Sequence, residues 1–90
     1  MEITLEGART IAGYSQSEAS KLFGVHYQTL AKWEEDNTRM PFEMVNKIPK
    51  IYGVEQNYIF FGKRNEFIRL QREKAKKFKT IQGHYSTEKR

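Results

Sequence analysis

The sequence predicts an all-α fold, in which a compact bundle of five short helices is followed by a basic C-terminal helix or tail. Three observations support this prediction. Apolar residues recur at spacings of three and four along residues 4–61, as they do on the buried face of a helix. Glycines follow several of these apolar stripes, at the points where helices end. The last third of the chain is rich in Lys and Arg and poor in apolar residues.

Length and composition indicate one small domain in a reducing compartment. The chain has 90 residues, of which 38% are hydrophobic, and it contains no Cys. Its stability must therefore come from packing, because neither disulfides nor thiolate metal sites can form. The longest apolar run, residues 58–61, is too short to cross a membrane, and the first residues do not form a signal peptide. We expect a cytoplasmic protein.

The net charge of +5 is unevenly distributed. Residues 1–61 contain six Lys and Arg against eight Asp and Glu, whereas residues 62–90 contain ten against three. The part of the chain with clear helical patterning is thus mildly acidic, and its net charge alone does not attract a polyanion. Any nucleic-acid site in this part must depend on the local arrangement of residues.

Three short helices are predicted over residues 4–13, 16–23 and 27–35. The second begins with a capping box, in which Ser15 and Glu18 satisfy each other's backbone amides. Gly13 and Gly24 follow the first two apolar stripes and can end those helices. In the second and third helices, we expect the apolar side chains to lie in the core, namely Leu22, Phe23, Val25, Leu30 and Trp33.

Two further short helices are predicted before residue 62. After a polar loop at 36–39, a fourth helix begins near Pro41, because a proline suits the first turn of a helix. Pro49 lies inside this helix and should cause a kink or an early end. The apolar segment 54–61 is compatible with a fifth helix. The stripe of the fourth helix consists of Val45, Ile48 and Tyr52.

A basic helix with a thin apolar stripe is predicted for residues 63–79, with a disordered tail over 80–90. This gives a domain at 1–62 followed by the two C-terminal segments. The helix either folds back on the domain or pairs with a second copy, and we favour its use as a dimerisation element. The stripe consists of Phe67, Leu70, Lys74 and Phe78.

The segment 16–33 contains two short helices joined at Gly24, with the small residues Ala19 and Ser20 where the helices must approach closely. Together with 48–54 and Phe61-Gly62, it resembles the helix-turn-helix domain of the phage repressor and Cro family, also called XRE-like. The resemblance covers about residues 3–62 and implies a repressor-like bundle. His26 stands where this family often has Ser or Thr.

The resemblance implies that the helix at 27–35 lies in the major groove and reads base edges with its first residues. Gln28 and Lys32 share one side of this helix, where a Gln amide suits adenine and a Lys amine suits guanine. The expected base contacts are His26, Tyr27, Gln28 and Lys32. The expected phosphate contacts are Gln16, Asn37, Thr38 and Arg39. The acidic residues Glu34, Glu35 and Asp36 must face away from the DNA, or they limit affinity.

These features predict a transcriptional regulator of a phage or mobile element, which binds an inverted-repeat operator in double-stranded DNA as a homodimer. We expect no enzyme activity, cofactor, metal, membrane or small-molecule substrate, since His26 and His84 are the only histidines. One alternative is a protein-binding module, such as an antitoxin or an inhibitor of a host defence nuclease. Another is nonspecific DNA binding by residues 63–90.

Overall fold

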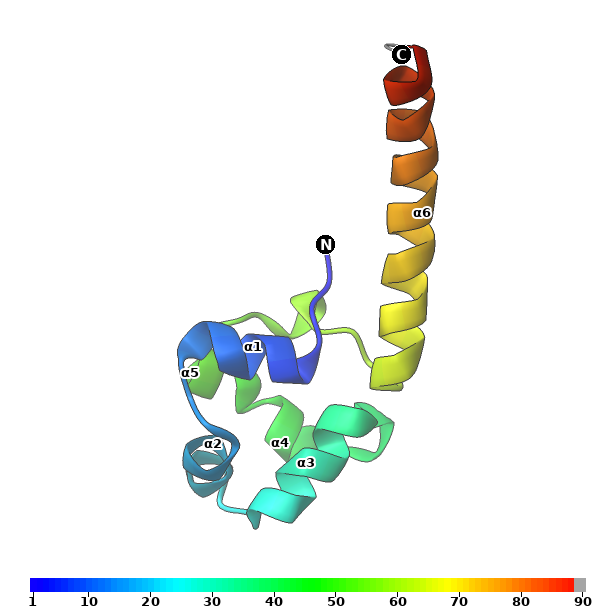
Figure 1. Cartoon of the computed structure of the whole chain (residues 1–90). Coiled ribbons are helices and arrows are strands. Elements are labelled where there is room, and N and C mark those ends of the chain that lie inside the picture. Colours follow the sequence, from blue (N-terminus) through cyan, green and yellow to red (C-terminus); the bar gives the residue numbers. More distant parts are fainter. Residues whose placement is uncertain (89–90) are drawn as a thin grey trace.

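The computed structural model describes residues 1–88 and their side chains as far as Phe78, and it consists of helices joined by short turns. The predicted all-α fold is therefore confirmed. Five short α-helices form a compact body, and a long sixth helix extends from it (Figure 1). The elements are α1 (Leu5–Ala12), α2 (Gln16–Phe23), α3 (Tyr27–Glu35), the 3₁₀ turn η1 (Asn37–Arg39), α4 (Phe42–Val45), α5 (Ile48–Tyr52), the 3₁₀ turn η2 (Gln56–Tyr58) and α6 (Arg64–Glu88).

The first three helices lie where the sequence predicts them, because their ends are fixed by local hydrogen bonds. At the start of α2, the Glu18 amide donates to Ser15 Oγ at 3.1 Å, and the Ser15 amide donates to Glu18 Oε1 at 2.8 Å. The bond from the Ser15 amide lowers the pKa of the Glu18 carboxyl. At the end of α2, Gly24 has φ +77°, a conformation that glycine adopts without steric cost. The chain therefore turns at once into α3.

The predicted fourth helix is divided into α4 and α5. Pro49 was expected to cause a kink or an early end. The helix is indeed interrupted just before this proline, at residues 46–47. Pro49 lies in the first turn of α5, where a missing amide costs no helical hydrogen bond. Pro41 precedes α4 as its N-cap residue. The break changes the direction of the chain, and it still leaves Ile48 and Tyr52 buried.

The expectation of a fifth helix over residues 54–61 was wrong. Only η2 is helical there, and the backbone on either side is extended. The reason is a long-range pairing with the N-terminus. The Ile3 amide donates to the Tyr58 carbonyl at 2.7 Å, and the Phe60 amide donates to the Ile3 carbonyl at 2.8 Å. This bridge anchors the N-terminal residues to the segment that leads into α6.

The core lies between α1, α2, α3 and α5. Phe23 is at its centre, with its ring edge-on to Trp33 at a centroid distance of 6.4 Å and to Tyr52 at 5.5 Å. Leu30 is fully buried, and Val25 packs against the core while partly exposed. Leu22 was expected to be buried but is 49% exposed, because it faces outward from α2. The buried apolar side chains are Leu5, Ala8, Ala19, Phe23, Leu30, Met40, Ile48, Tyr52 and Ile59.

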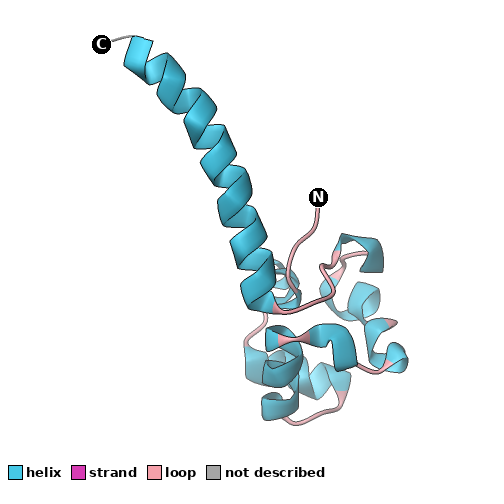
Figure 2. Cartoon of the chain, turned by 90° about the vertical axis from the view of Figure 1, so that its right-hand side faces the viewer, coloured by secondary structure: helices cyan, strands magenta, loops and turns pink. Residues whose placement is uncertain are grey.

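Among the described residues, the C-terminal helix α6 contacts the body near its base. Arg64 forms an ion pair with Glu6 at 3.2 Å, and the Phe67 ring lies 5.2 Å from the Phe60 ring. Beyond these contacts the helix extends away from the body in both views (Figures 1 and 2). The structure continues the helix to residue 88, beyond the expected end at 79, while residues 89–90 of the expected tail lie outside the described residues.

Candidate nucleic-acid interface

The outer side of α3 is the candidate surface for reading DNA. α2 and α3 pack against each other across the turn at Gly24, at the lower end of the body in Figure 1. Tyr27 is 49% exposed in the first turn of α3, and Gln28 and Lys32 are exposed one turn apart on the same side. The fold therefore presents a phenol, an amide and an amine to solvent from one short helix.

His26 is the N-cap residue of α3 as well as a predicted base contact. Its Nδ1 accepts a hydrogen bond from the Gln28 amide at 3.2 Å. Its ring lies 4.6 Å from the Tyr27 ring, with 30° between the ring planes. The cap therefore uses one ring nitrogen, and the Nε2 edge is the part of this side chain that is left for a base.

Replacement of His26 tests the cap. We expect His26→Ala to lower the free energy of unfolding by about 1 kcal/mol, because the Gln28 amide loses its acceptor. The variant His26→Ser replaces the ring nitrogen by a hydroxyl oxygen that can accept from the same amide, and it should retain the stability. Urea unfolding followed by circular dichroism compares the two variants. Equal losses in both would contradict the capping role.

A buried ion pair holds α3 against α1 and the start of α2. Arg9 Nε donates to Glu34 Oε2 at 2.6 Å, and Arg9 Nη1 donates to the Tyr14 carbonyl at 2.9 Å. The Glu34 side chain is only 1% exposed and that of Arg9 is 13% exposed. The hydrogen bond with Glu34 raises the pKa of Arg9 above its ordinary value. Because the pair joins two helices distant in sequence, it fixes the orientation of the candidate reading helix.

Gln16, a predicted phosphate contact, belongs to the same network. Its Nε2 donates to Glu34 Oε1 at 2.9 Å. A Gln amide nitrogen carries two hydrogens, so one remains for a phosphate oxygen while the other holds the side chain in place. Gln16 is thus the first residue of α2, and its side chain is partly exposed.

The turn after α3 differs from the prediction. Asn37 is 4% exposed; its Nδ2 donates to the Phe60 carbonyl at 3.1 Å, and its Oδ1 accepts from the Gly62 amide at 2.9 Å. This side chain is therefore unavailable to a phosphate, contrary to what the resemblance implied. It connects the turn after α3 to the segment before α6.

Thr38 and Arg39 remain exposed in this turn. Thr38 Oγ1 donates to Asp36 Oδ1 at 2.7 Å, and this hydrogen bond lowers the pKa of Asp36. Because the hydroxyl hydrogen is used there and lies beside a carboxylate, Thr38 is a poor phosphate ligand. Of the three residues predicted in this turn, Arg39 is the one whose exposure and charge suit a phosphate.

Asn37→Ala is expected to lower the free energy of unfolding by about 2 kcal/mol or more. The substitution leaves the Phe60 carbonyl and the Gly62 amide without their partners, and each lost partner of a buried backbone group is costly. The exposed amide of Asn57 provides a matched control, and Asn57→Ala should change stability little. Urea unfolding of both variants measures the difference. Similar midpoints for the two would contradict the bridging role of Asn37.

The acidic residues at the end of α3 do not all face the same way. Glu34 points inward to Arg9, and Asp36 is held in the turn by Thr38. Glu35 is exposed, and it lies seven residues from Gln28 and therefore on the same side of the helix. Of the two outcomes expected for these acidic residues, Glu35 therefore matches the one in which an acidic group beside the DNA would limit affinity.

Sequence reasoning missed Arg9 and the inward role of Glu34. A signal was present, since Glu34 lies four residues after Leu30 and so falls on the buried stripe of its helix. A charged residue at such a position requires a partner. The identity of that partner depends on the packing of α1 and is not encoded locally.

Among the side chains that the structure describes, no group of His, Cys, Asp or Glu is arranged to hold a metal ion. None of the helices within the described residues is both long enough and apolar enough to span a membrane. The exposed groups at the α2–α3 end include amide, amine, phenol and guanidinium groups, which can contact base edges and phosphates.

A capped helix, a glycine turn and a second helix with an exposed polar side define the helix-turn-helix class of DNA-binding proteins. A family profile described as helix-turn-helix matches residues 5–58, which is more than half of the chain. The chain belongs to this family, in its XRE-type branch, and is a DNA-binding transcription regulator. The family expected from the sequence is thereby confirmed. A comparison with curated proteins found no match.

Proposed function

We propose that the protein is a repressor that binds, as a homodimer, an operator made of two inverted half-sites. The observation that carries this proposal is the exposed side of α3 with Gln28 and Lys32 on a helix-turn-helix. Each copy places α3 in the major groove, and the centres of the half-sites are about one duplex turn, roughly 34 Å, apart. Occupation of an operator that overlaps a promoter blocks transcription.

Base recognition falls to the first turns of α3. Gln28 pairs with the edge of an adenine, and Lys32 donates to the acceptors of a guanine. Tyr27 and the Nε2 edge of His26 contact bases or thymine methyl groups at the start of the helix. Gln28 and Lys32, which share one side of α3, supply most of the sequence preference, because they reach successive base pairs along the groove.

Phosphate contacts set the register of the helix. Gln16 donates its second amide hydrogen to a phosphate at the N-terminus of α2, where exposed backbone amides also favour an anion. Arg39, after α3, contacts the phosphate on the other side of the groove. The bond from Gln16 to Glu34 supports this assignment, since it orders the Gln16 side chain before DNA binds.

Dimerisation occurs through the apolar side of α6, over residues 63–79. Phe67, Leu70 and Phe78 lie on this side, and Phe78 is 62% exposed where the helix extends beyond the body. A helix without tertiary contacts is marginally stable in water. In the dimer, the apolar stripe of one copy covers the apolar stripe of the other through a two-fold contact.

Selection of binding sites from a random duplex pool at about 150 mM salt tests the proposal, because salt must be fixed when phosphate contacts dominate affinity. We expect enrichment of a palindromic site, together with a dimer in sedimentation. Enrichment of a single, non-repeated site by a monomer would contradict the dimeric operator. No enriched site would favour the alternative of a protein-binding module, such as an antitoxin or a nuclease inhibitor.

A further inference from the structure

Three cationic side chains line one side of α6. Arg69, Arg72 and Lys76 are exposed, and they follow one another at spacings of three and four. We call these three residues the basic ridge. At 100° per residue, the ridge lies on the side of α6 opposite to Phe67 and Phe78. A second copy that covers the apolar side therefore leaves the basic ridge open to solvent.

The ridge lies in the part of the chain that carries the excess of positive charge. Residues 1–61 have more acidic than basic residues, whereas residues 62–90 have seven more basic than acidic ones. Within the ridge, Arg69 pairs with Glu73 at 3.3 Å, and both side chains are about 60% exposed. An exposed pair of this kind contributes little, so a phosphate can replace the carboxylate.

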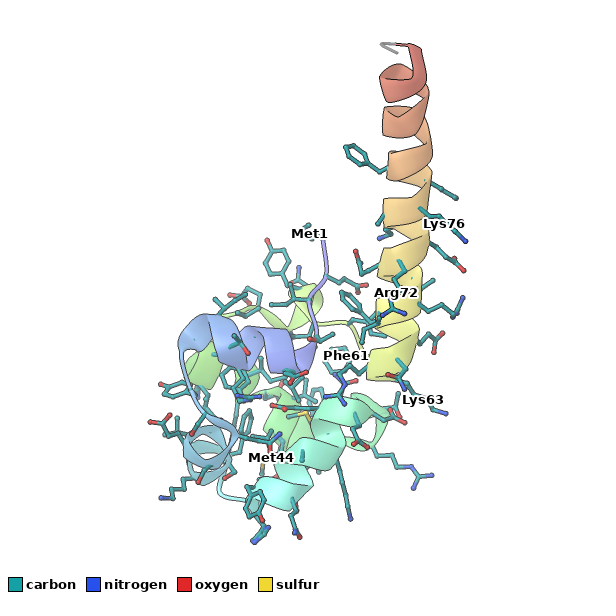
Figure 3. The ribbon with its side chains drawn as sticks, viewed as in Figure 1. Met1, Met44, Phe61, Lys63, Arg72 and Lys76 are labelled. Atoms are coloured by element: carbon teal, nitrogen blue, oxygen red, sulfur yellow. The ribbon has the colours of Figure 1, made fainter. Side chains whose placement is uncertain are left out.

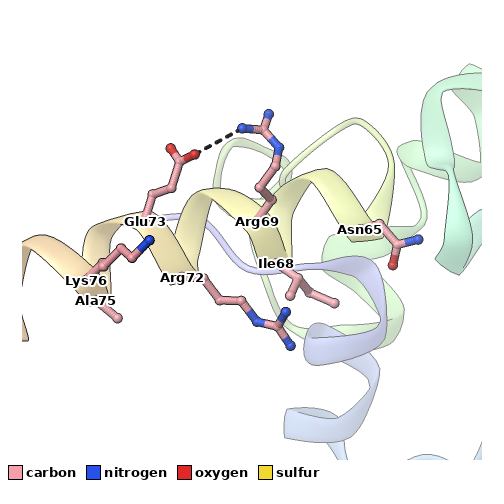
Figure 4. A pocket seen from close by; sticks show the side chains of 7 residues that line it. All are labelled: Asn65, Ile68, Arg69, Arg72, Glu73, Ala75 and Lys76. Atoms are coloured by element: carbon pink, nitrogen blue, oxygen red, sulfur yellow. Dashed lines mark hydrogen bonds and ion pairs between the residues drawn. The ribbon is translucent and has the colours of Figure 1, made fainter.

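The ridge has a shape that suits a phosphate chain. Its residues line an open pocket of about 810 Å³ along α6, together with Asn65, Ile68, Glu73 and Ala75. In the view of Figure 4 the Arg69 side chain extends above the helix and the Arg72 side chain below it, and Lys76 lies one turn beyond Arg72. From Arg69 to Lys76 the helix rises about 10 Å. Duplex DNA carries one phosphate per roughly 1.7 Å of its axis, so three cations over this length meet several phosphates.

The position of the ridge separates it from the helix-turn-helix. α6 extends away from the α2–α3 end of the body, with Arg72 in the lower half of the helix and Lys76 near its middle (Figures 1 and 3). At its base, Lys63 forms a backbone bridge with Asp36, directly after α3. α6 thus starts beside α3 and extends away from the side of the body that carries α2 and α3.

We infer that the basic ridge of α6 is a second, sequence-independent contact surface for the phosphate backbone of duplex DNA, and that it engages DNA outside the half-site contacted by α3. DNA is the polyanion favoured here, because the chain belongs to a family of DNA-binding regulators and duplex DNA carries a dense row of phosphates. The inference rests on the proposed function in assigning the half-site to α3, and it does not require the dimer.

The test measures binding to a non-operator duplex of about 40 base pairs between about 50 and 200 mM salt. The ridge variant is Arg69→Gln/Arg72→Gln/Lys76→Gln. The control Lys21→Gln/Lys50→Gln/Lys77→Gln removes the same charge from exposed positions off the ridge. A third variant, Arg69→Lys/Arg72→Lys, keeps the charge. Circular dichroism verifies that all three retain the helical signal.

We expect the slope of log affinity against log salt to become shallower by about 2 to 3 in the ridge variant, since each lost phosphate contact contributes about 0.9. The control should change the slope by less than about 0.9, the contribution of one phosphate contact. The Arg-to-Lys variant should have the same slope as the parent protein. Equal slopes in the ridge and control variants would overturn the inference. It would also be overturned if ridge-dependent binding were found with phosphatidylserine vesicles but not with DNA, because α6 would then be a membrane-surface helix.

Discussion

Arg9→Met is expected to lower the free energy of unfolding by about 3–5 kcal/mol. The Glu34 carboxylate is almost completely buried, and the substitution leaves it with the Gln16 amide as its main partner. A domain of this size has a total stability of only about 3–5 kcal/mol. The variant should therefore be largely unfolded at 25 °C, and urea titration followed by circular dichroism measures the loss.

Two further variants separate the loss of a partner from the loss of the pair. Arg9→Met/Glu34→Leu removes both charges and should recover much of the stability, because no buried charge is left alone. Glu73→Gln breaks the exposed pair with Arg69 and should leave stability unchanged. An Arg9→Met variant as stable as the parent protein would contradict the role given to the buried pair.

Gln28→Ala/Lys32→Ala is expected to lower the affinity for the selected operator by about 2–4 kcal/mol, or roughly 30-fold to 1000-fold. Both side chains are exposed on α3 and contribute little to packing, so the free energy of unfolding should not change. Fluorescence anisotropy at fixed salt gives the affinity for the operator and for a scrambled duplex. The loss should be larger for the operator, since base contacts rather than phosphate contacts are removed.

The matched control for this pair lies outside both α3 and α6. Lys50→Ala/Asn57→Ala removes one amine and one amide from exposed positions. It should keep the preference for the operator over the scrambled duplex. If the α3 variant and this control lost the same fraction of operator affinity, the preference would not depend on the side of α3 that we assign.

Local signals were sufficient to predict α1, α2 and α3. The capping box at Ser15 and the glycine that ends α2 act within a few residues, so the sequence reveals both ends of that helix. The segment 54–61 was mispredicted because its extended form depends on hydrogen bonds with Ile3, which is more than fifty residues away. Periodicity alone cannot separate a short apolar helix from such a segment.

The same distinction applies to the candidate site. The exposure of Gln28 and Lys32 follows from the period of an α-helix whose opposite side carries Leu30. The burial of Asn37 depends on the backbone of residues 60–62, which nothing near Asn37 in the sequence indicates. Resemblance to a family therefore placed a phosphate contact where this fold has a structural bridge.

Amide chemical-shift mapping by NMR tests most directly whether α3 and the start of α2 form the DNA-binding surface. The ¹⁵N-labelled protein is titrated with the selected operator duplex, and the perturbed amides are placed on the structure. We predict that the largest shifts fall at residues 15–17 and 26–32. Shifts confined to α4 and α5, with the amides of Tyr27 and Gln28 unchanged, would contradict the assignment.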